Sequence, residues 1–170
     1  RLRVALVGAG AVAARCHLPA IRAVPEVRPT LVVDADAERA RRFAAEHKIP
    51  TAYGSYAQLL TDPRIDAVYI AVPNGLHGRW TKAALEAGKH VLCEKPFTAN
   101  AEEAASVAEA ARHSGLVVME AFHYRYHALT ARMLEILNSD ELGSITKMAA
   151  WIYFPRVPPT NARWVYQLAG

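Results

Sequence analysis

Polar side chains that could do chemistry recur directly after short apolar stretches of this chain. Asp34 follows one such stretch, Asn74 and His77 follow another, and Glu94 and Lys95 follow a third. If these stretches are parallel strands, their carboxyl ends lie at one edge of a sheet, where open α/β sheets bind ligands. Each residue alone is explained equally well as a loop or turn residue. Their recurrence at consecutive strand ends is what favours a site.

A glycine turn near the N-terminus indicates the ligand. Residues 3–15 predict a buried strand, a tight turn and a helix start. Gly8, Gly10 and Ala13 occupy the small positions of a dinucleotide-binding fingerprint: one allows the turn, one the approach of a pyrophosphate to backbone amides, and one close helix packing. A purely structural turn would have the same spacing. The second apolar strand, which ends in Asp34, favours the dinucleotide interpretation.

Composition bounds the class of protein. With 170 residues, 52% of them hydrophobic and 21% charged, the chain can bury a sizeable core, and no apolar run is long enough to cross a bilayer. The net charge is +4, but the basic residues are scattered, which argues against nucleic acid as a partner. Cys16 and Cys93 lack metal-type spacing, so we expect reduced, buried thiols in a cytoplasmic protein. No signal peptide is visible, although a chain that begins with Arg1 could have lost a leader.

Strands and helices alternate over the first 124 residues, which predicts a doubly wound parallel sheet of the Rossmann type. The expected strands cover residues 4–7, 30–33, 67–71, 90–93 and 116–119, and the expected helices cover residues 37–47, 56–60, 76–87 and 101–113. Later in the chain, residues 128–137 predict an amphipathic helix and 145–154 a long strand without a crossover helix. We therefore expect a dinucleotide-binding domain over residues 1–124. Residues 125–170 would begin a second, α+β domain with an antiparallel sheet, most of which lies beyond the chain.

The whole chain resembles the glucose-fructose oxidoreductase, inositol dehydrogenase and dihydrodiol dehydrogenase (Gfo/Idh/MocA) family. The resemblance rests on Gly8-Ala-Gly10 with Ala13, Asp34-Ala-Asp36, Pro73-Asn74-Gly-Leu-His77, Gly88 through Glu94-Lys95-Pro96, and Glu120-Ala-Phe-His-Tyr-Arg125. It implies an NAD(P)-dependent dehydrogenase that transfers a hydride between the nicotinamide and a secondary hydroxyl of a sugar, polyol or cyclic diol. Two alternatives stay open: a glycosidase that uses bound NAD, and a regulatory protein that binds cofactor without turnover.

The resemblance also implies roles for individual residues. Lys95 would be the catalytic residue beside the reacting carbon of the substrate, with a cis bond to Pro96. Asn74 and His77 would border the nicotinamide, and Glu94 its ribose. Further candidates are assigned only because they match positions of the family. For the cofactor these are Pro96, Arg125 and Trp164, and for the substrate they are His123 and Arg163 in addition to Lys95. Arg125, Arg163 and Trp164 are equally well explained as packing or domain-contact residues.

Asp34 favours NAD over NADP, because a carboxylate at the end of the second strand accepts hydrogen bonds from the ribose hydroxyls and repels a 2′-phosphate. Arg39, Arg41 and Arg42 weaken this expectation, since one of them could hold a phosphate.

Glu120, His123 and His127 have the spacing of a metal site, but no third ligand motif follows, so we expect no metal. We also expect a homo-oligomer that acts on a small molecule, without a membrane or nucleic-acid partner.

Overall fold

The computed structural model describes residues 1–153 of the chain. Contacts within the chain divide it into a first compact unit over Arg1–Ala121 and a second unit that begins at Phe122. The candidate residues Arg163 and Trp164 lie outside the described residues.

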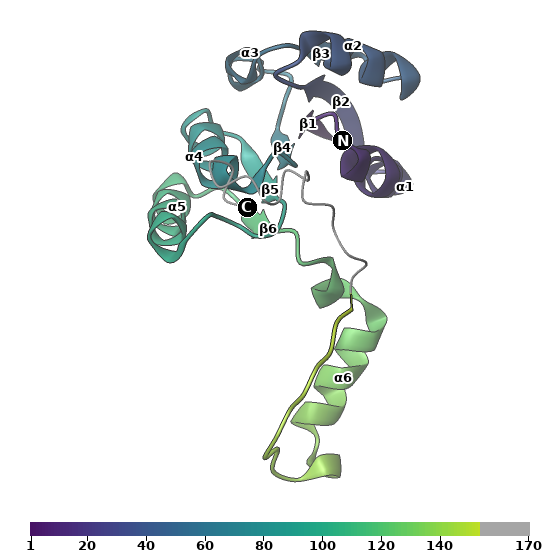
Figure 1. Ribbon diagram of the computed structural model, residues 1–170, viewed down its shortest axis with the longest axis vertical. Coiled ribbons are helices and arrows are strands. Elements are labelled where there is room, and N and C mark those ends of the chain that lie inside the picture. Colours follow the sequence, from purple (N-terminus) through teal and green to yellow (C-terminus); the bar gives the residue numbers. More distant parts are fainter. Residues whose placement is uncertain (154–170) are drawn as a thin grey trace. The chain divides into compact units, whose positions relative to one another are not determined.

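The first unit is built on a six-stranded parallel sheet in the order β3-β2-β1-β4-β5-β6 (Figure 1). The strands are β1 (Leu2–Val7), β2 (Val27–Val33), β3 (Thr51–Tyr53), β4 (Ala67–Ile70), β5 (His90–Cys93) and β6 (Val118–Glu120). The order reverses between β1 and β4, as the doubly wound prediction requires. At such a reversal the connecting segments leave in opposite directions and open a crevice at the carboxyl edge.

Strand register places the candidate residues along one edge. Val7 pairs with Val33 on one side and with Ile70 on the other, and Ile70 pairs with Cys93. The residues that follow these partners, among them Gly8, Asp34 and Glu94, are therefore level with one another at the carboxyl ends of the strands.

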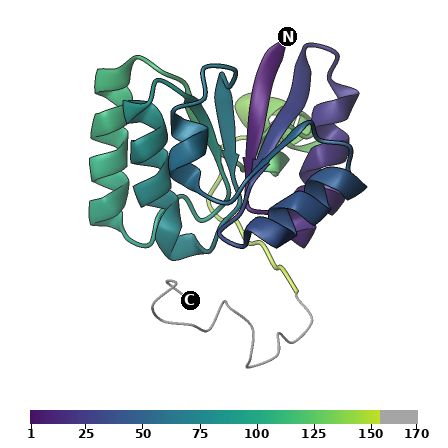
Figure 2. The same ribbon diagram turned by 90° about the horizontal axis from the view of Figure 1, so that it is seen from above.

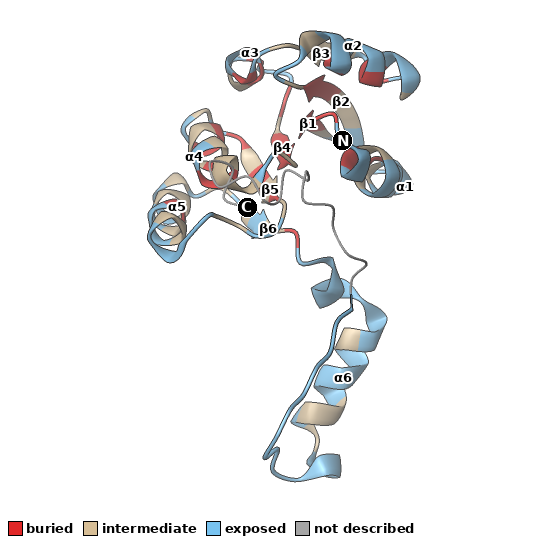
Figure 3. Ribbon diagram, viewed as in Figure 1, coloured by how far each residue is buried: buried red, intermediate tan, exposed pale blue. Residues whose placement is uncertain are grey.

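Helices cover both faces of the sheet, so the strands are apolar on both faces (Figure 2). They are α1 (Leu18–Ala23), α2 (Ala37–Glu46), α3 (Tyr56–Leu60), α4 (His77–Glu86) and α5 (Ala101–Ser114). Successive residues of β1 point to opposite faces: Val7 packs with Tyr56 and Leu85, whereas Leu6 packs with Leu18 and Phe43. The buried residues accordingly concentrate in the strands and the inner helix faces (Figure 3).

Local signals set the helix boundaries. The carboxylate of Asp36 accepts hydrogen bonds from the amides of Glu38 and Arg39, both at 3.0 Å, and begins α2. Asn100 caps α5 in the same way through the amide of Glu103, at 2.9 Å. The predicted helices and strands of this unit agree with the observed ones to within a few residues.

The second unit contains α6 (Ala128–Asn138), as predicted, flanked by the short 3-10 turns His123–Tyr126 and Asp140–Leu142. The long strand expected over residues 145–154 is wrong for the residues described, because 145–153 carry no regular secondary structure. A strand exists only when another strand pairs with it, and residues 122–153 contain no other extended segment that pairs. The expected antiparallel sheet is therefore not found in this part of the chain.

The composition also led to expectations about membrane-spanning segments and about the two cysteines. Within residues 1–153 no helix is both long enough and apolar enough to cross a membrane. Cys93 is buried as expected, but Cys16 is exposed on the outer side of a helical turn that follows the glycine turn, which corrects the expectation that both thiols are buried.

Candidate functional site

The glycine turn is shaped by the strand beside it. The amide of Gly8 donates to the carbonyl of Val33 at 2.8 Å, and Gly8 has a φ of +105°, which side-chain-bearing residues rarely adopt. A Cβ on Gly8 would lie 2.7 Å from the carbonyl oxygen of Ala71. A Cβ on Gly10, in contrast, would meet no atom within 4 Å. The backbone is therefore crowded at Gly8 and open at Gly10, while Ala13 is completely buried below the turn.

A cleft of about 630 Å³ opens beside this turn, a volume typical of small-molecule sites. Its walls come from the carboxyl ends of β1, β2 and β4, where the strand order reverses. They include Gly8, Gly10, Asp34, Arg39, Pro73 and Trp80.

Asp34 joins the glycine turn to the start of α2. One carboxylate oxygen accepts the amide of Ala9 at 2.9 Å, and the other accepts the amide of Asp36 at 3.0 Å and the guanidinium of Arg39. Burial of Asp34 raises its pKa, but the hydrogen bonds from Arg39 and the two amides outweigh burial, so the pKa is lowered and the side chain is ionised.

One of the three arginines considered in sequence turns back toward this carboxylate. Arg39 pairs with Asp34, and half of its side chain remains exposed. Arg41 instead pairs with Glu38 on the outer face of α2, at 2.6 Å. The cleft thus presents an acidic group and a basic group at the same place.

His77 is buried rather than open to the cleft. His77 is the first residue of α4 and is 1% exposed. Nδ1 lies 2.7 Å from the carbonyl oxygen of Pro96, and Nε2 lies 2.8 Å from that of Val72. A neutral imidazole has one N–H and can donate to one of these oxygens, whereas a doubly protonated ring donates to both. The ring of His77 therefore lies between the cleft wall at Val72 and the loop that carries Lys95, and it donates to at least one of them.

The Lys95–Pro96 bond is cis, as the family resemblance implied. Lys95 and Pro96 are both exposed immediately after β5. Asn74 begins the turn Asn74–Leu76, of which the last residue, Leu76, lines the cleft together with Pro73 before the turn. The Lys95 ammonium is thus presented at the edge of the sheet to which the cleft belongs.

The carboxylate of Glu94, like that of Asp34, has three hydrogen-bonding partners. Its Oε1 accepts the hydroxyl of Tyr69 at 2.9 Å and lies 2.9 Å from Nε2 of His17, and its Oε2 accepts the amide of Lys95 at 3.1 Å. Burial raises the pKa of Glu94, but the hydrogen bonds from His17 and Tyr69 more than offset this effect and lower it. Glu94 is therefore a carboxylate whose direction is set by its neighbours.

Sequence reasoning missed His17 and Tyr69. Tyr69 lies in the middle of a strand buried on both faces, where a hydroxyl requires a partner, and this was the available signal. Its pKa is raised by burial first and by the charge of Glu94 second, so the phenol keeps its proton and donates it. His17 gave no comparable signal.

Glu120 supports the same loop from the neighbouring strand. Its Oε1 accepts the amide of Phe97 at 2.9 Å. Cys93, behind it, is completely buried, and burial, with smaller effects of the Glu120 and Glu94 carboxylates, raises its pKa to about 12. The Cys93 thiol is therefore neutral and unsuited to act as a nucleophile at neutral pH.

The candidate site residues of the second unit are described by their contacts within that unit. His123 and Arg125 lie exposed in a 3-10 turn, and Nδ1 of His127 accepts the amide of Leu129 at the start of α6. The substrate and cofactor contacts expected of His123 and Arg125 stay predictions. Over residues 1–153, no group of three His, Cys, Asp or Glu side chains is placed to hold a metal ion.

Comparisons with known proteins agree with this geometry. The sequence pattern of GFO_IDH_MocA, the oxidoreductase family with an NAD-binding Rossmann fold, matches residues 2–122. A D-xylose 1-dehydrogenase (NADP(+)) of Haloferax volcanii is 44% identical over 153 residues, which are 90% of this chain and 46% of the relative.

Two further relatives are sugar reductases or ketoreductases by name. The dTDP-3,4-didehydro-2,6-dideoxy-alpha-D-glucose 3-reductase of Saccharopolyspora spinosa is 36% identical over 99% of this chain and 51% of its own. The crystal structure of a variant of KijD10, a 3-ketoreductase of Actinomadura kijaniata in complex with TDP-benzene and NADP, is 35% identical. It superimposes with a TM-score of 0.77 over 85% of this chain and 44% of its own. The chain thus spans about half the length of these relatives.

Proposed function

Because this chain belongs to the Gfo/Idh/MocA family of oxidoreductases and contains its NAD(P)-binding Rossmann domain, we propose that the whole protein is a dehydrogenase acting on a secondary hydroxyl. The substrate would be a sugar, a polyol or a cyclic diol. One observation carries the proposal: the buried ring of His77 lies between the wall of the cleft beside the glycine turn and the loop that presents Lys95. A cofactor site and a proton-transferring group therefore flank one buried side chain.

The residues of the cleft fit a dinucleotide. The space at Gly10, which a Cβ would enter without contact, leaves the backbone amides and the helix start accessible to a pyrophosphate. Asp34 would accept the adenosine ribose hydroxyls, and Asn74 would border the nicotinamide. When bound, the cofactor supplies the hydride acceptor or donor. Lys95 would hold the reacting hydroxyl through Nζ and exchange its proton with it.

Cofactor choice depends on the pair formed by Asp34 and Arg39. The xylose dehydrogenase of Haloferax volcanii is named for NADP, and KijD10 was crystallised with NADP. Arg39 offers such a cofactor a guanidinium. The Asp34 carboxylate lies directly beside that guanidinium and opposes a 2′-phosphate. We expect the carboxylate to prevail and NAD to bind about tenfold more tightly, the effect of roughly one charged hydrogen bond.

Calorimetric titration of the whole protein with NAD and NADP tests this preference. In an Arg39→Ala variant NADP binding should weaken more than NAD binding, and Arg41→Ala, which alters a neighbouring pair on the outer face, serves as the control. Tighter binding of NADP than of NAD by the unaltered protein would show the preference to be wrong.

A test of turnover uses the whole protein with NAD and a panel of aldoses, polyols and trans-dihydrodiols. We expect the absorbance of NADH to rise with at least one of them. Hydrolysis of a glycoside without net NADH would favour an NAD-using glycosidase instead. Cofactor binding with no turnover of any substrate would favour a regulatory protein.

Self-association belongs to the same proposal. The side chains of Met148, Trp151, Ile152 and Tyr153 are more than two-thirds exposed. We propose that the second domain of the whole protein covers such apolar residues in a sheet that also joins subunits, giving a homo-oligomer. Sedimentation equilibrium of the whole protein should then give a mass above that of one chain.

A further inference from the structure

The side chain of His17 connects the segment after the glycine turn to the Lys95 loop through Glu94. His17 is the last residue of the π-helical turn Ala13–His17, and its ring stacks on that of Tyr69 with centroids 4.2 Å apart and planes at 26°. Its Nε2 lies 2.9 Å from Oε1 of Glu94. Three elements that lie far apart in the sequence therefore meet at one carboxylate oxygen.

The π-helical turn explains how His17 reaches this place. Ala13 and Leu18 are both buried, at 0% and 1% exposed, although they are five residues apart. The amide of Leu18 donates to the carbonyl of Ala13, the bond from residue i+5 to residue i that defines a π-helix. Residues five apart lie closer to one face in this wider turn than in an α-helix, so both can face the core. His17, directly before Leu18, is thereby brought to the edge of the sheet above Tyr69. Single π-turns of this kind occur frequently at functional sites.

The hydrogen-bond inventory assigns the donor. Glu94 is ionised and can only accept, so Nε2 of His17 carries a proton and donates it to Oε1. Tyr69 donates to the same oxygen, and the amide of Lys95 donates to Oε2. Both oxygens of Glu94 are thus used, and the plane of the carboxylate is defined by contacts on either side.

We propose that His17 is a positioning residue for Lys95. It directs the carboxylate of Glu94, and the carboxylate in turn holds the amide of Lys95. Its effect on turnover rests on the dehydrogenase function proposed above, whereas its effect on the Lys95 backbone does not. The contact makes the conformation of the Lys95 loop depend on the segment that follows the glycine turn.

The variant His17→Phe in the whole protein separates the hydrogen bond from the stacking contact, because phenylalanine keeps a ring for Tyr69 but has no donor. His17→Gln restores a donor. His47→Phe is the control, since His47 also packs against an aromatic ring, that of Phe43, with centroids 4.4 Å apart and planes tilted by 56°, but lies at the end of α2.

Two measurements need no substrate. Carboxylate NMR should show that the pKa of Glu94 rises in His17→Phe, because a hydrogen bond that favours the charged form is lost. Hydrogen exchange at the Lys95 amide should become faster. Neither should change in His47→Phe. Unchanged exchange at Lys95 in His17→Phe would overturn the proposal.

Kinetics then measure the consequence. In His17→Phe we expect kcat to fall about tenfold while the Kd for NAD changes less than about twofold, and His17→Gln to recover most of kcat. An unchanged kcat, or an equal loss in His17→Gln, would contradict a positioning role. If the unaltered protein turns over no substrate, the proposed function fails, and the exchange of the Lys95 amide alone decides the inference.

Discussion

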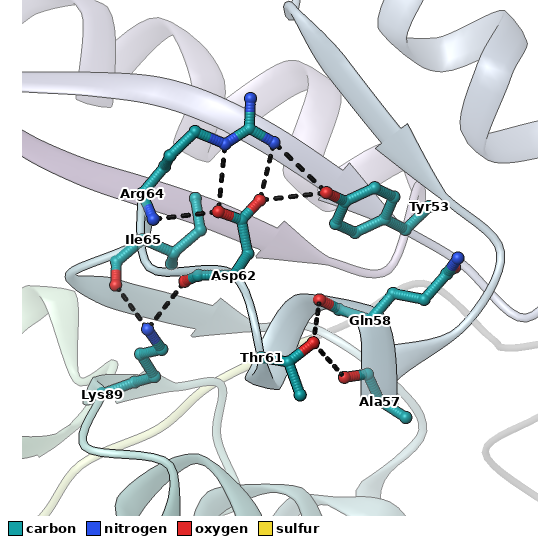
Figure 4. A network of polar contacts seen from close by, with 8 residues as sticks. All are labelled: Tyr53, Ala57, Gln58, Thr61, Asp62, Arg64, Ile65 and Lys89. Atoms are coloured by element: carbon teal, nitrogen blue, oxygen red, sulfur yellow. Dashed lines mark hydrogen bonds and ion pairs between the residues drawn. The ribbon is translucent and has the colours of Figure 1, made fainter.

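The two edges of the parallel sheet hold their polar groups in different ways. At the amino edge, before β4, both oxygens of Asp62 are occupied: Arg64 donates to them at 3.0 and 2.7 Å, and the hydroxyl of Tyr53 donates at 3.0 Å (Figure 4). The buried ammonium of Lys89 donates to the carbonyls of Asp62 and Ile65 at 2.9 and 2.8 Å. The hydrogen-bonding capacity of these groups is used within the protein, and the bonds hold the loop between α3 and β4 in place.

At the carboxyl edge the hydrogen bonds surround the site and leave its centre accessible. Glu94 accepts hydrogen bonds at both of its oxygens, and the His77 ring is buried between two carbonyl oxygens. Lys95 is nevertheless exposed, and the backbone at Gly10 borders open space. The comparison indicates that charge at the amino edge stabilises the fold, whereas at the carboxyl edge buried contacts position groups that remain available to a ligand. Substitutions at the two edges should therefore separate stability from function.

The largest effect is expected for Lys95→Ala in the whole protein. Loss of a positioned proton-transfer group should lower kcat by about 10²- to 10⁴-fold, while the Kd for NAD and the melting temperature change little. Lys82→Ala, which removes an ammonium bonded only to Ser106 among the described residues, is the control. A near-normal kcat in Lys95→Ala would contradict the conclusion that the carboxyl edge positions Lys95 for catalysis.

Asp62→Asn should have the opposite profile. It removes the charge that Arg64 and Tyr53 surround, and we expect a loss of about 2–4 kcal/mol in the free energy of unfolding. The kcat of the molecules that remain folded should be unchanged. Urea unfolding with Arg64→Ala and the double variant measures the coupling, and additive effects would show that the network contributes nothing as a unit.

Gly8 and Gly10 sharpen the comparison within one turn. Gly8→Ala places a methyl group against the carbonyl of Ala71 at a positive φ, so we expect a loss of about 1–3 kcal/mol in the free energy of unfolding.

The added methyl group of Gly10→Ala meets no atom within 4 Å, so the free energy of unfolding should change by less than about 0.5 kcal/mol. Its methyl group would enter the space proposed for the pyrophosphate, however. Calorimetry should show weaker NAD binding at an unchanged melting temperature, and undiminished affinity would place the pyrophosphate elsewhere.

The smallest effect is expected in the pH dependence of stability, through Asp66. The hydrogen bond from Arg3 holds the pKa of Asp66 far below its usual range, although burial opposes it. This stabilisation is complete above the unfolded pKa of about 4 and is lost as the pH falls toward the lower folded value. Stability should therefore decline below about pH 5, and less steeply in Asp66→Asn. Urea titrations at neutral and acid pH measure this, and identical pH dependence of the two proteins would contradict the assignment.

Local sequence signals were sufficient for the first unit because they act over a few residues. The caps at Asp36 and Asn100, the apolar strands and the turn at Gly8 each require only a neighbouring backbone or a face of given polarity. The polar residues at the strand ends were recognised for the same reason. The strand expected over residues 145–154 is absent from the described residues 145–153, because an apolar segment becomes a strand only when another strand pairs with it.

The sequence by itself thus determined the Rossmann fold, the glycine turn and the presence of Asp34, Glu94 and Lys95 at one edge. The tertiary structure decided which partners hold them: His17 reaches Glu94 through a π-helical turn, and the buried ring of His77 lies between two loops. Such pairs depend on the order of the strands and on the register of helices against them. No residue specifies these relations alone, because each follows from how all the apolar faces of the sheet are covered together.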